Sequence, residues 1–203
     1  MSVQTRGRLL RAAKKVFSRK GYHNAQISHI IDEAGVARGT FYLHFRSKEE
    51  IFKELLREVI SELRTIIKVI DIHGDPAQQV VENIAGVIDF ALEERDLARI
   101  VLERNSDPEL FGALNDFFEE VVEMIRESLD KGIALGIIRE CDTEILARSI
   151  LGALKEVIRS LLDKEEVDTY GVAAQVFELG LRGLWNQPEG GESHGGSSAL
   201  QGL

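Results

Sequence analysis

The sequence has a single cysteine, three prolines and no long apolar run. One cysteine, Cys141, excludes an intrachain disulfide and a metal site built from cysteines, and it suits a reducing compartment. The first residues are charged where a secretory signal needs an apolar stretch, and no run approaches the roughly 18 apolar residues of a membrane span. With 203 residues, 44% of them hydrophobic, the chain is long enough to bury a core. We therefore expect a cytoplasmic globular protein that does not enter a membrane.

Catalytic and metal-binding motifs are also missing. The chain has no G-x-S-x-G elbow, no H-E-x-x-H, no phosphate-binding glycine loop and no cysteine nucleophile with suitable partners. Its five histidines form no pair at helical ligand spacing and have no cysteine companion; they are His23, His29, His44, His73 and His194. The sequence therefore predicts no enzyme, no catalytic residue, no metal site and no cofactor.

The charge is unevenly distributed along the chain. The net charge is -9, yet residues 1–48 hold ten basic side chains against two acidic ones, a net charge of +8, so the remaining 155 residues carry -17. A cationic head on an anionic body is typical of a protein whose head alone meets a polyanion such as the DNA backbone. A solvated basic face without a partner, or a head that binds an anionic membrane or an acidic protein, has the same charge pattern.

Apolar residues recur at helical spacing in nearly every segment, and no alternating strand pattern of useful length appears. The predicted fold class is therefore all-α. Asp75-Pro76 and Asp107-Pro108 predict helix starts, because aspartate caps a helix and proline suits its first turn. The glycine- and serine-rich residues 186–203 predict a flexible tail. We expect helices at about 3–20, 27–34, 38–44, 48–70, 76–93, 95–104, 108–134, 143–163 and 168–185.

Residues 22–48 have the pattern of a helix-turn-helix, with two short helical patterns flanking Gly35, which supplies the tight turn. The inward face of the first helix is formed by Ile27, Ile30, Ile31 and Ala34. The second helix exposes a short surface that fits a major groove; it carries Arg38, Thr40, Tyr42 and His44. Gly39 suits a close approach of backbone to a phosphate, and Lys48 can pair with a phosphate without carrying sequence information.

The run from Thr5 to Ile51, with TRGRLLRAAKKVFSRKGY, AGVARGTFYLHF and SKEEIF, resembles the DNA-binding domain of the TetR family of bacterial transcriptional repressors. The resemblance implies an N-terminal three-helix DNA-binding domain over residues 1–47 and a larger helical ligand-binding and dimerisation domain over residues 48–185. It matches Thr40, Tyr42 and Lys48 to backbone-contacting positions and Arg38 to a variable position that faces bases. The candidate DNA-binding residues are Gln26, Ser28, Ala37, Arg38, Gly39, Thr40, Tyr42, His44 and Lys48.

Three residues depart from the family pattern. Gln26 and Ala37 replace the usual Ser or Thr caps of the two motif helices, and each such cap is typically worth about 1 kcal/mol; Ser28 is a possible substitute for one. Ile31 replaces an alanine and enlarges the small core. We expect Phe45 in the core and Tyr42 on the DNA side. The alternative for Arg38 is a solvated surface charge that does not contact bases.

For the rest of the chain the resemblance implies a two-fold dimer and a ligand pocket. The last two predicted helices, 143–163 and 168–185, carry small residues that allow close helix approach; these are Gly152, Ala153, Gly180 and Gly183. The family docks this pair against its copy in a second subunit, which suits a palindromic operator. Packing of these faces within one monomer is the alternative.

The middle helices, about 76–134, are where the family resemblance places an inducer pocket. Their apolar residues include Val87 and Ile125, and Asn83 interrupts them, but a filled core has the same sequence signature. The candidate ligand-binding residues are Phe90, Arg99, Arg104 and Phe118, with the arginines as anchors for an anionic headgroup. A second resemblance, carried by LARIVLERNSDPEL and DKGIALGIIRECDTEILARSILGAL, is to acyl-CoA-responsive fatty-acid regulators. We therefore expect a dimeric repressor released from its operator by a small hydrophobic ligand, with a long-chain acyl-CoA as the leading candidate.

Overall fold

The computed structural model describes residues 2–102 and 108–180, and within these ranges every regular element is a helix. This confirms the predicted all-α class. None of the helices in these ranges is both long and apolar enough to cross a lipid bilayer. The predicted tail at 186–203 and the candidate residue Arg104 lie outside the described residues. The helices are α1 (Ser2–Asn24), α2 (Ile27–Ala34), α3 (Arg38–Tyr42), α4 (Lys48–Ile66), α5 (Pro76–Glu93), α6 (Arg95–Leu102), α7 (Pro108–Ala134), α8 (Thr143–Leu161) and α9 (Thr169–Gly180).

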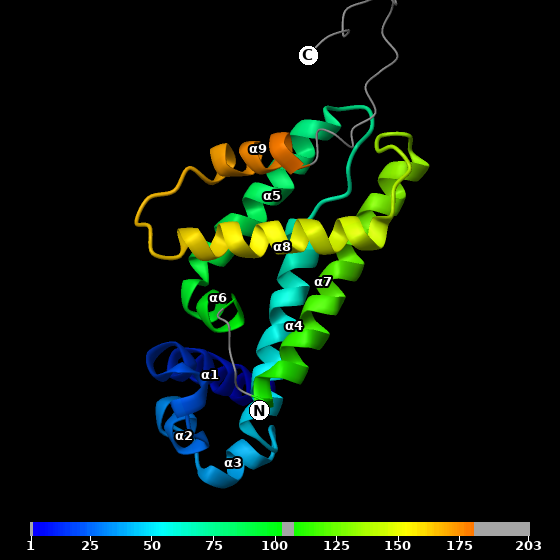
Figure 1. Ribbon diagram of the computed structural model, residues 1–203. Coiled ribbons are helices and arrows are strands. Elements are labelled where there is room, and N and C mark those ends of the chain that lie inside the picture. Colours follow the sequence, from blue (N-terminus) through cyan, green and yellow to red (C-terminus); the bar gives the residue numbers. More distant parts are fainter. Residues whose placement is uncertain (1, 103–107, 181–203) are drawn as a thin grey trace, which may run out of the picture.

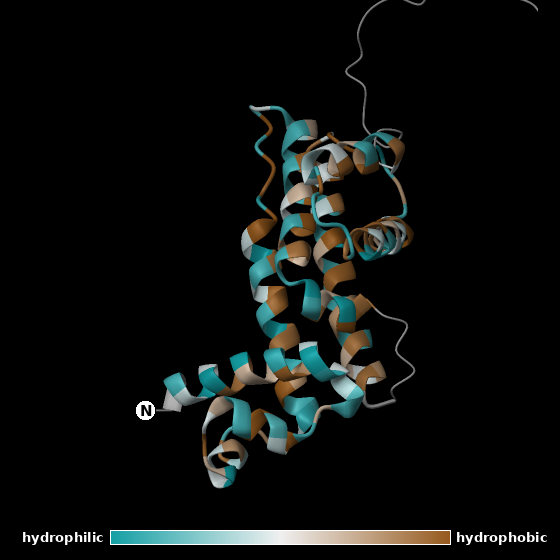
Figure 2. Cartoon of the chain, turned by 90° about the vertical axis from the view of Figure 1, so that its left-hand side faces the viewer, coloured by the Kyte–Doolittle hydropathy of each residue, from teal (hydrophilic) through white to brown (hydrophobic). Residues whose placement is uncertain are grey.

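Helices α1, α2 and α3 gather at one end of the molecule, and α5, α8 and α9 lie at the other (Figure 1). Helices α4 and α7 pack against each other and run along the molecule between the two ends. Hydrophilic and hydrophobic residues are interspersed along the helices (Figure 2). This pattern is what amphipathic helices show when they pack around a shared core.

The core of the N-terminal end is aromatic. Phe17, Phe41 and Phe52 are completely buried, and Phe45 is 2% exposed, which confirms the prediction that Phe45 belongs to the core. The Phe52 ring lies 5.8 Å from that of Phe17 and 5.1 Å from that of Tyr22, both edge-on. Because Phe52 belongs to α4, the first turns of this long helix are part of the N-terminal core, while its later turns pack on α7.

Two of the predicted helix ends were wrong by several residues. Helix α1 continues to Asn24 instead of ending near residue 20, through a kink at Gly21, where φ is 70°. Helix α4 ends at Ile66 instead of near residue 70. The apolar residues after Ile66 have helical spacing, yet side chains from α5 hold their backbone in an extended segment.

This extended segment is fixed by two amide side chains one turn apart on α5. Asn83 accepts a hydrogen bond from the Lys68 N–H at 3.0 Å and donates to the Lys68 carbonyl at 2.9 Å. Gln79 binds Asp71 in the same way: it accepts a hydrogen bond from the Asp71 N–H at 2.7 Å and donates to the Asp71 carbonyl at 2.9 Å. Each amide thus satisfies both backbone groups of one residue, as a neighbouring strand would. These four bonds stabilise the non-helical segment that follows α4.

Helix α6 connects the two ends of the molecule. It packs against α1 on one side and contacts α5 and α8 on the other. Lys14 of α1 forms an ion pair with Glu94, the C-cap residue of α5 directly before α6. A displacement of α6 therefore acts on the N-terminal helices directly.

Candidate functional site

Helices α2 and α3 form a helix-turn-helix, as the sequence predicted. Gly35 ends α2 in the left-handed conformation, with φ 61°, and its N–H donates to the Asp32 carbonyl at 3.2 Å. The Arg8 guanidinium of α1 donates to the carbonyls of Ala34, at 2.6 Å, and of Gly35, at 3.2 Å. Because α2 ends on these carbonyls, a positive charge stabilises the turn. The role of Arg8 was not foreseen, since its partners lie 26 and 27 residues away in the sequence.

Helix α3 divides sharply into an inward and an outward face. Phe41 is fully buried, whereas Tyr42 is 44% exposed and Leu43, its C-cap residue, is 83% exposed. The Arg38 guanidinium lies 5.9 Å from the centre of the Tyr42 ring, so these two side chains share one exposed face. Gly39 is exposed, and a Cβ added there would meet no protein atom within 4 Å. The backbone at this position is therefore open to a close approach from outside the protein.

Thr40 and His44 lie beside this exposed face and are half-buried. The structure thus brings Arg38, Thr40, Tyr42 and His44 together on one short helix and its C-terminal turn. Arg38 carries the formal charge of this surface, and the short helix is small enough to enter a major groove.

The caps of the two motif helices follow the departures seen in the sequence. Ala37 begins α3 without a side-chain hydrogen bond. At α2, the Nδ1 atom of His29 accepts a hydrogen bond from the Gln26 N–H at 3.2 Å, which is the returning half of a capping box. Ser28, named above as a possible substitute cap, donates instead to the Gln26 side chain at 3.4 Å. His29 is therefore a capping residue that the sequence analysis missed, although a polar residue three positions after a cap is a recognised signal.

Lys48 begins α4 beside the same surface and already has partners within the protein. Its ammonium group donates to the Tyr22 carbonyl at 3.0 Å and lies 4.2 Å from the centre of the Tyr22 ring. These contacts fix its position and leave it further N–H donors, because an ammonium group has three.

Several cations of the basic head are neutralised by nearby carboxylates. Arg6 pairs with Glu54 at 2.6 Å, and Arg19 pairs with Glu33 across α1 and α2. The hydrogen bond from Arg19 lowers the pKa of Glu33 below its ordinary value of 4.5. Part of the positive charge near the N-terminus therefore joins helices to each other, and the sequence charge of this head overstates what α3 and its surroundings offer to a polyanion.

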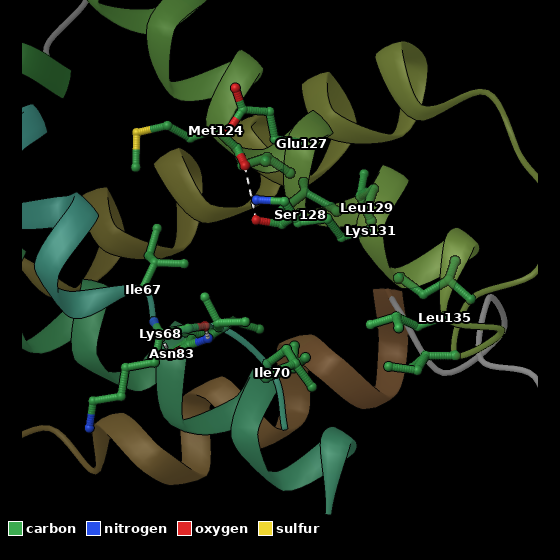
Figure 3. A pocket seen from close by; sticks show the side chains of 18 of the residues that line it. Ile67, Lys68, Ile70, Asn83, Met124, Glu127, Ser128, Leu129, Lys131 and Leu135 are labelled. Atoms are coloured by element: carbon green, nitrogen blue, oxygen red, sulfur yellow. Dashed lines mark hydrogen bonds between the residues drawn. The ribbon is translucent and has the colours of Figure 1, made fainter. Parts of the chain in front are cut away.

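A cavity of about 590 Å³ lies at the far end of α4. It opens between the last turn of α4, the extended segment at 67–70, α5, the C-terminal half of α7 and α8 (Figure 3). Its walls are mostly aliphatic. The polar residues on its exposed rim include Lys68, Lys131, Glu127 and Ser128, and Arg64, also on the rim, pairs with Glu120 at 3.2 Å. The aliphatic residues of the wall include Ile67, Ile70, Val80, Ile84, Val87, Ile125, Leu129, Ile138, Ile150 and Leu154.

The structure brings none of the described candidate ligand residues to this cavity. Phe90 is half-buried against the core. The Phe118 ring is covered by the Lys155 ammonium, 3.7 Å from its centre, and burial lowers the pKa of Lys155. Arg99 forms an ion pair with Asp163 at 2.6 Å. The residues that do line it include Asn83, Val87 and Ile125, which the sequence analysis placed in the middle helices without assigning them to a ligand.

Arg99 belongs to a cluster of arginines that joins α6 to the end of α8, which we call the arginine clasp. Arg95 and Arg99 donate to the Leu162 carbonyl at 2.6 and 3.1 Å. In return, Arg159 of α8 donates twice to the carbonyl of Leu102, the last residue of α6, at 3.1 and 2.7 Å. Each helix thus caps the other's C-terminal carbonyls with positive charge.

The candidate dimer helices are separated from each other within the monomer. Helix α9 packs on α5, and α8 packs on α7. Leu154 of α8 is buried, whereas Gly152 and Ala153 are exposed, as is Ile145, at 65%. On α9, Leu179 is 90% exposed. Each helix therefore keeps a face with small or apolar residues outside the monomer, and Gly183 lies outside the described residues.

Two family models match the chain. Residues 9–55 match that of the bacterial regulatory proteins of the tetR family, and residues 73–184 match that of the tetracyclin repressor-like C-terminal domain. The fatty acid metabolism regulator protein of Bacillus subtilis is 30% identical over 191 residues, covering 88% of this chain and 95% of the relative. The uncharacterized HTH-type transcriptional regulator YdgC of the same organism is 29% identical and covers 90% and 93%.

A solved structure shows the same fold with a ligand. The crystal structure of the transcriptional regulator FadR from Bacillus subtilis in complex with stearoyl-CoA superimposes with a TM-score of 0.72 and 27% identity, over 88% of this chain and 98% of that one.

Proposed function

Because the chain belongs to the TetR family of bacterial transcriptional regulators, we propose that it is a dimeric repressor that a small hydrophobic ligand releases from its operator. The family consists of DNA-binding regulators rather than enzymes. Membership therefore favours DNA over the anionic membrane or acidic protein that the charge pattern left open. The observation that carries the proposal is an exposed α3 face and a large apolar cavity at opposite ends of one helix, α4.

In this proposal α3 enters the major groove and α4 begins at the phosphate backbone. Arg38 has the donors for a guanine edge, and it lies over Tyr42 on the exposed face. Thr40, Tyr42 and Lys48 contact phosphates and set the register. Gln26 and Ser28 at the start of α2 approach the neighbouring backbone. The logarithm of the DNA-binding constant should then fall linearly with the logarithm of the salt concentration, with a slope of about -0.9 for each phosphate contacted.

The proposed dimer uses the outward faces of α8 and α9. Ile145 and Leu179 are large apolar side chains that solvent surrounds in the monomer, and a two-fold copy would cover both. Gly152 and Ala153 of α8 are also exposed, and their small size allows close contact with another helix. Two recognition helices are also required on energetic grounds, since one short helix contacts too few bases for useful specificity.

The proposed effector is an anionic amphiphile with a long apolar chain, and a long-chain acyl-CoA is the leading candidate. The aliphatic walls of the cavity suit an acyl chain, and Lys68 and Lys131 on its rim suit phosphate groups. These lysines replace Arg99 as proposed anchors, because Arg99 is bound in the arginine clasp. The stearoyl-CoA complex of the Bacillus subtilis relative supports this choice.

For ligand binding to weaken operator binding in this proposal, the ligand must favour a conformation with a different separation of the two α3 helices. Helix α4 provides one route, because it runs from the cavity wall at Arg64 to the N-terminal core at Phe52. Half-sites read by a dimer lie about 34–36 Å apart, so a small displacement removes base contacts without unfolding. A tenfold loss of operator affinity needs only about 1.4 kcal/mol of coupling.

The experiment is a titration of stearoyl-CoA with and without a duplex that the protein has selected from random DNA. We expect stearoyl-CoA to bind, and the duplex to weaken its binding by the factor by which stearoyl-CoA weakens the duplex. Lys68→Met with Lys131→Met should reduce acyl-CoA affinity, while Lys53→Met, remote on α4, should not. Enrichment of no sequence would refute the repressor, and equal acyl-CoA affinity with and without DNA would refute the effector.

A further inference from the structure

Leu43 is the more exposed of the two large apolar side chains on the outer side of α3, at 83% against 44% for Tyr42. The core below α3 is complete without it, since Phe41 and Phe45 are 0% and 2% exposed and fill the inward face. A single exposed leucine on a protein surface is unremarkable in itself. Its position at the end of the helix that faces the proposed operator makes it informative.

Leu43 stands beside bare backbone. Its N–H donates to the Gly39 carbonyl at 3.1 Å, so Gly39 lies one helical turn earlier on the same side of α3. A side chain at Gly39 would meet nothing within 4 Å. The space next to the leucine methyl groups is therefore open, and a base pair can approach the α3 backbone there. Arg38 and Tyr42 occupy the adjacent strip of the helix.

We propose that Leu43 reads a thymine in each operator half-site through the thymine C5-methyl group. Among the four bases, only thymine presents an apolar group at the major-groove edge. Leucine has no donor or acceptor, so it would desolvate the polar edge of a cytosine or guanine without pairing it. Arg38 and Leu43 then divide the recognition: a hydrogen-bonding contact at one end of α3 and a methyl contact at the other. This inference depends on the proposed function, because it needs an operator.

The experiment replaces thymine by deoxyuridine, one position at a time, in the selected duplex. This change deletes the methyl group and keeps every hydrogen-bonding atom of the base pair. Burial of one methyl is worth about 0.8 kcal/mol, which is about fourfold in affinity. We expect a fourfold loss at one thymine position of a half-site, and roughly 15-fold when both symmetric positions are changed.

The matched protein variant is Leu43→Ala, which is expected to fold because the side chain is exposed. It should bind the thymine and deoxyuridine duplexes with equal affinity, while Ile72→Ala, at an exposed apolar residue outside the cavity lining, should keep the full discrimination. If no single thymine shows a methyl effect that disappears in Leu43→Ala, the inference is wrong. A uniform loss by Leu43→Ala on both duplexes would also refute it, because it would indicate a backbone or protein contact. Failure to select any duplex is a different result and refutes the repressor.

Discussion

The arginine clasp allows a sharp test of how α6 is held, with Arg159→Met as the perturbation. Methionine keeps the apolar stem of the side chain and removes both hydrogen bonds to the Leu102 carbonyl. It also removes the ion pair with Glu156, which is largely exposed and contributes little. The change therefore isolates the bonds between α8 and the C-terminal end of α6.

The expected loss follows from the geometry of these bonds. A hydrogen bond from a charged donor contributes about 1.5–3 kcal/mol. Both bonds of Arg159 share one carbonyl, and its side chain is 33% exposed, so the lower end of this range applies, about 1.5 kcal/mol in total. For a chain of this size, each kcal/mol corresponds to about 2–4 °C in Tm, so the Tm should fall by about 3–6 °C.

The assay is thermal unfolding followed by circular dichroism, with Arg126→Met as the control. Within the described residues Arg126 forms ion pairs with Glu123 and Asp130 of its own helix, and exposed pairs of this kind are worth about 0.3–0.5 kcal/mol. If Arg159→Met loses no more stability than Arg126→Met, the clasp does not hold α6. In the selected-duplex titration, the clasp variant should also show a smaller effect of stearoyl-CoA on DNA affinity, because α6 then loses two of the four clasp bonds to α8.

Three further predictions concern the cavity, the turn and a surface ion pair. Val87→Phe fills part of the cavity; calorimetry should detect reduced stearoyl-CoA binding, with Tm unchanged or raised. Gly35→Ala places a side chain at φ 61° and should cost about 1–2 kcal/mol in denaturant unfolding. The hydrogen bond from Arg19 lowers the pKa of Glu33, so its contribution to stability is present at neutral pH and is lost as the pH falls through that lowered pKa. The Tm difference between Glu33→Gln and the parent should therefore shrink only below pH 4.5, the ordinary value; a difference that stays constant into stronger acid would contradict this.

The helix-turn-helix was predictable because its determinants are local. Gly35 forms the turn in its left-handed conformation, and the apolar residues on either side have helical spacing. A window of about 25 residues is therefore enough to predict the motif. The family motif placed Tyr42 on the DNA side, since Phe41 and Phe45 can already fill the inward face. What the local pattern missed, such as Arg8 on the turn carbonyls, depends on residues far away in the sequence.

The cavity was beyond such reasoning because chain segments far apart in the sequence create it. Its wall at residues 67–70 leaves the helical path, and Asn83 of α5 binds the Lys68 backbone there. The other walls come from four helices whose apolar residues have the same periodicity whether they fill a core or line a cavity. Arg99 was predicted as a ligand anchor because its charge lies beside an apolar run, and in the structure its partners lie at the C-terminal end of α8.

Helix α6, like α4, connects the N-terminal helices to the rest of the molecule in the proposed mechanism. Helix α4 is anchored in the aromatic N-terminal core and reaches the cavity wall, so it responds to what fills the cavity. Helix α6 touches α1 and is bound by the arginine clasp to α8, which carries part of the proposed dimer face. The N-terminal helices are thus held by two connections, one from the cavity and one from the dimer face. In the proposed mechanism, a ligand that moved α4 while α6 stayed fixed would shift α3 relative to the α1–α6 contact, and this shift would change the separation of the two recognition helices in the dimer.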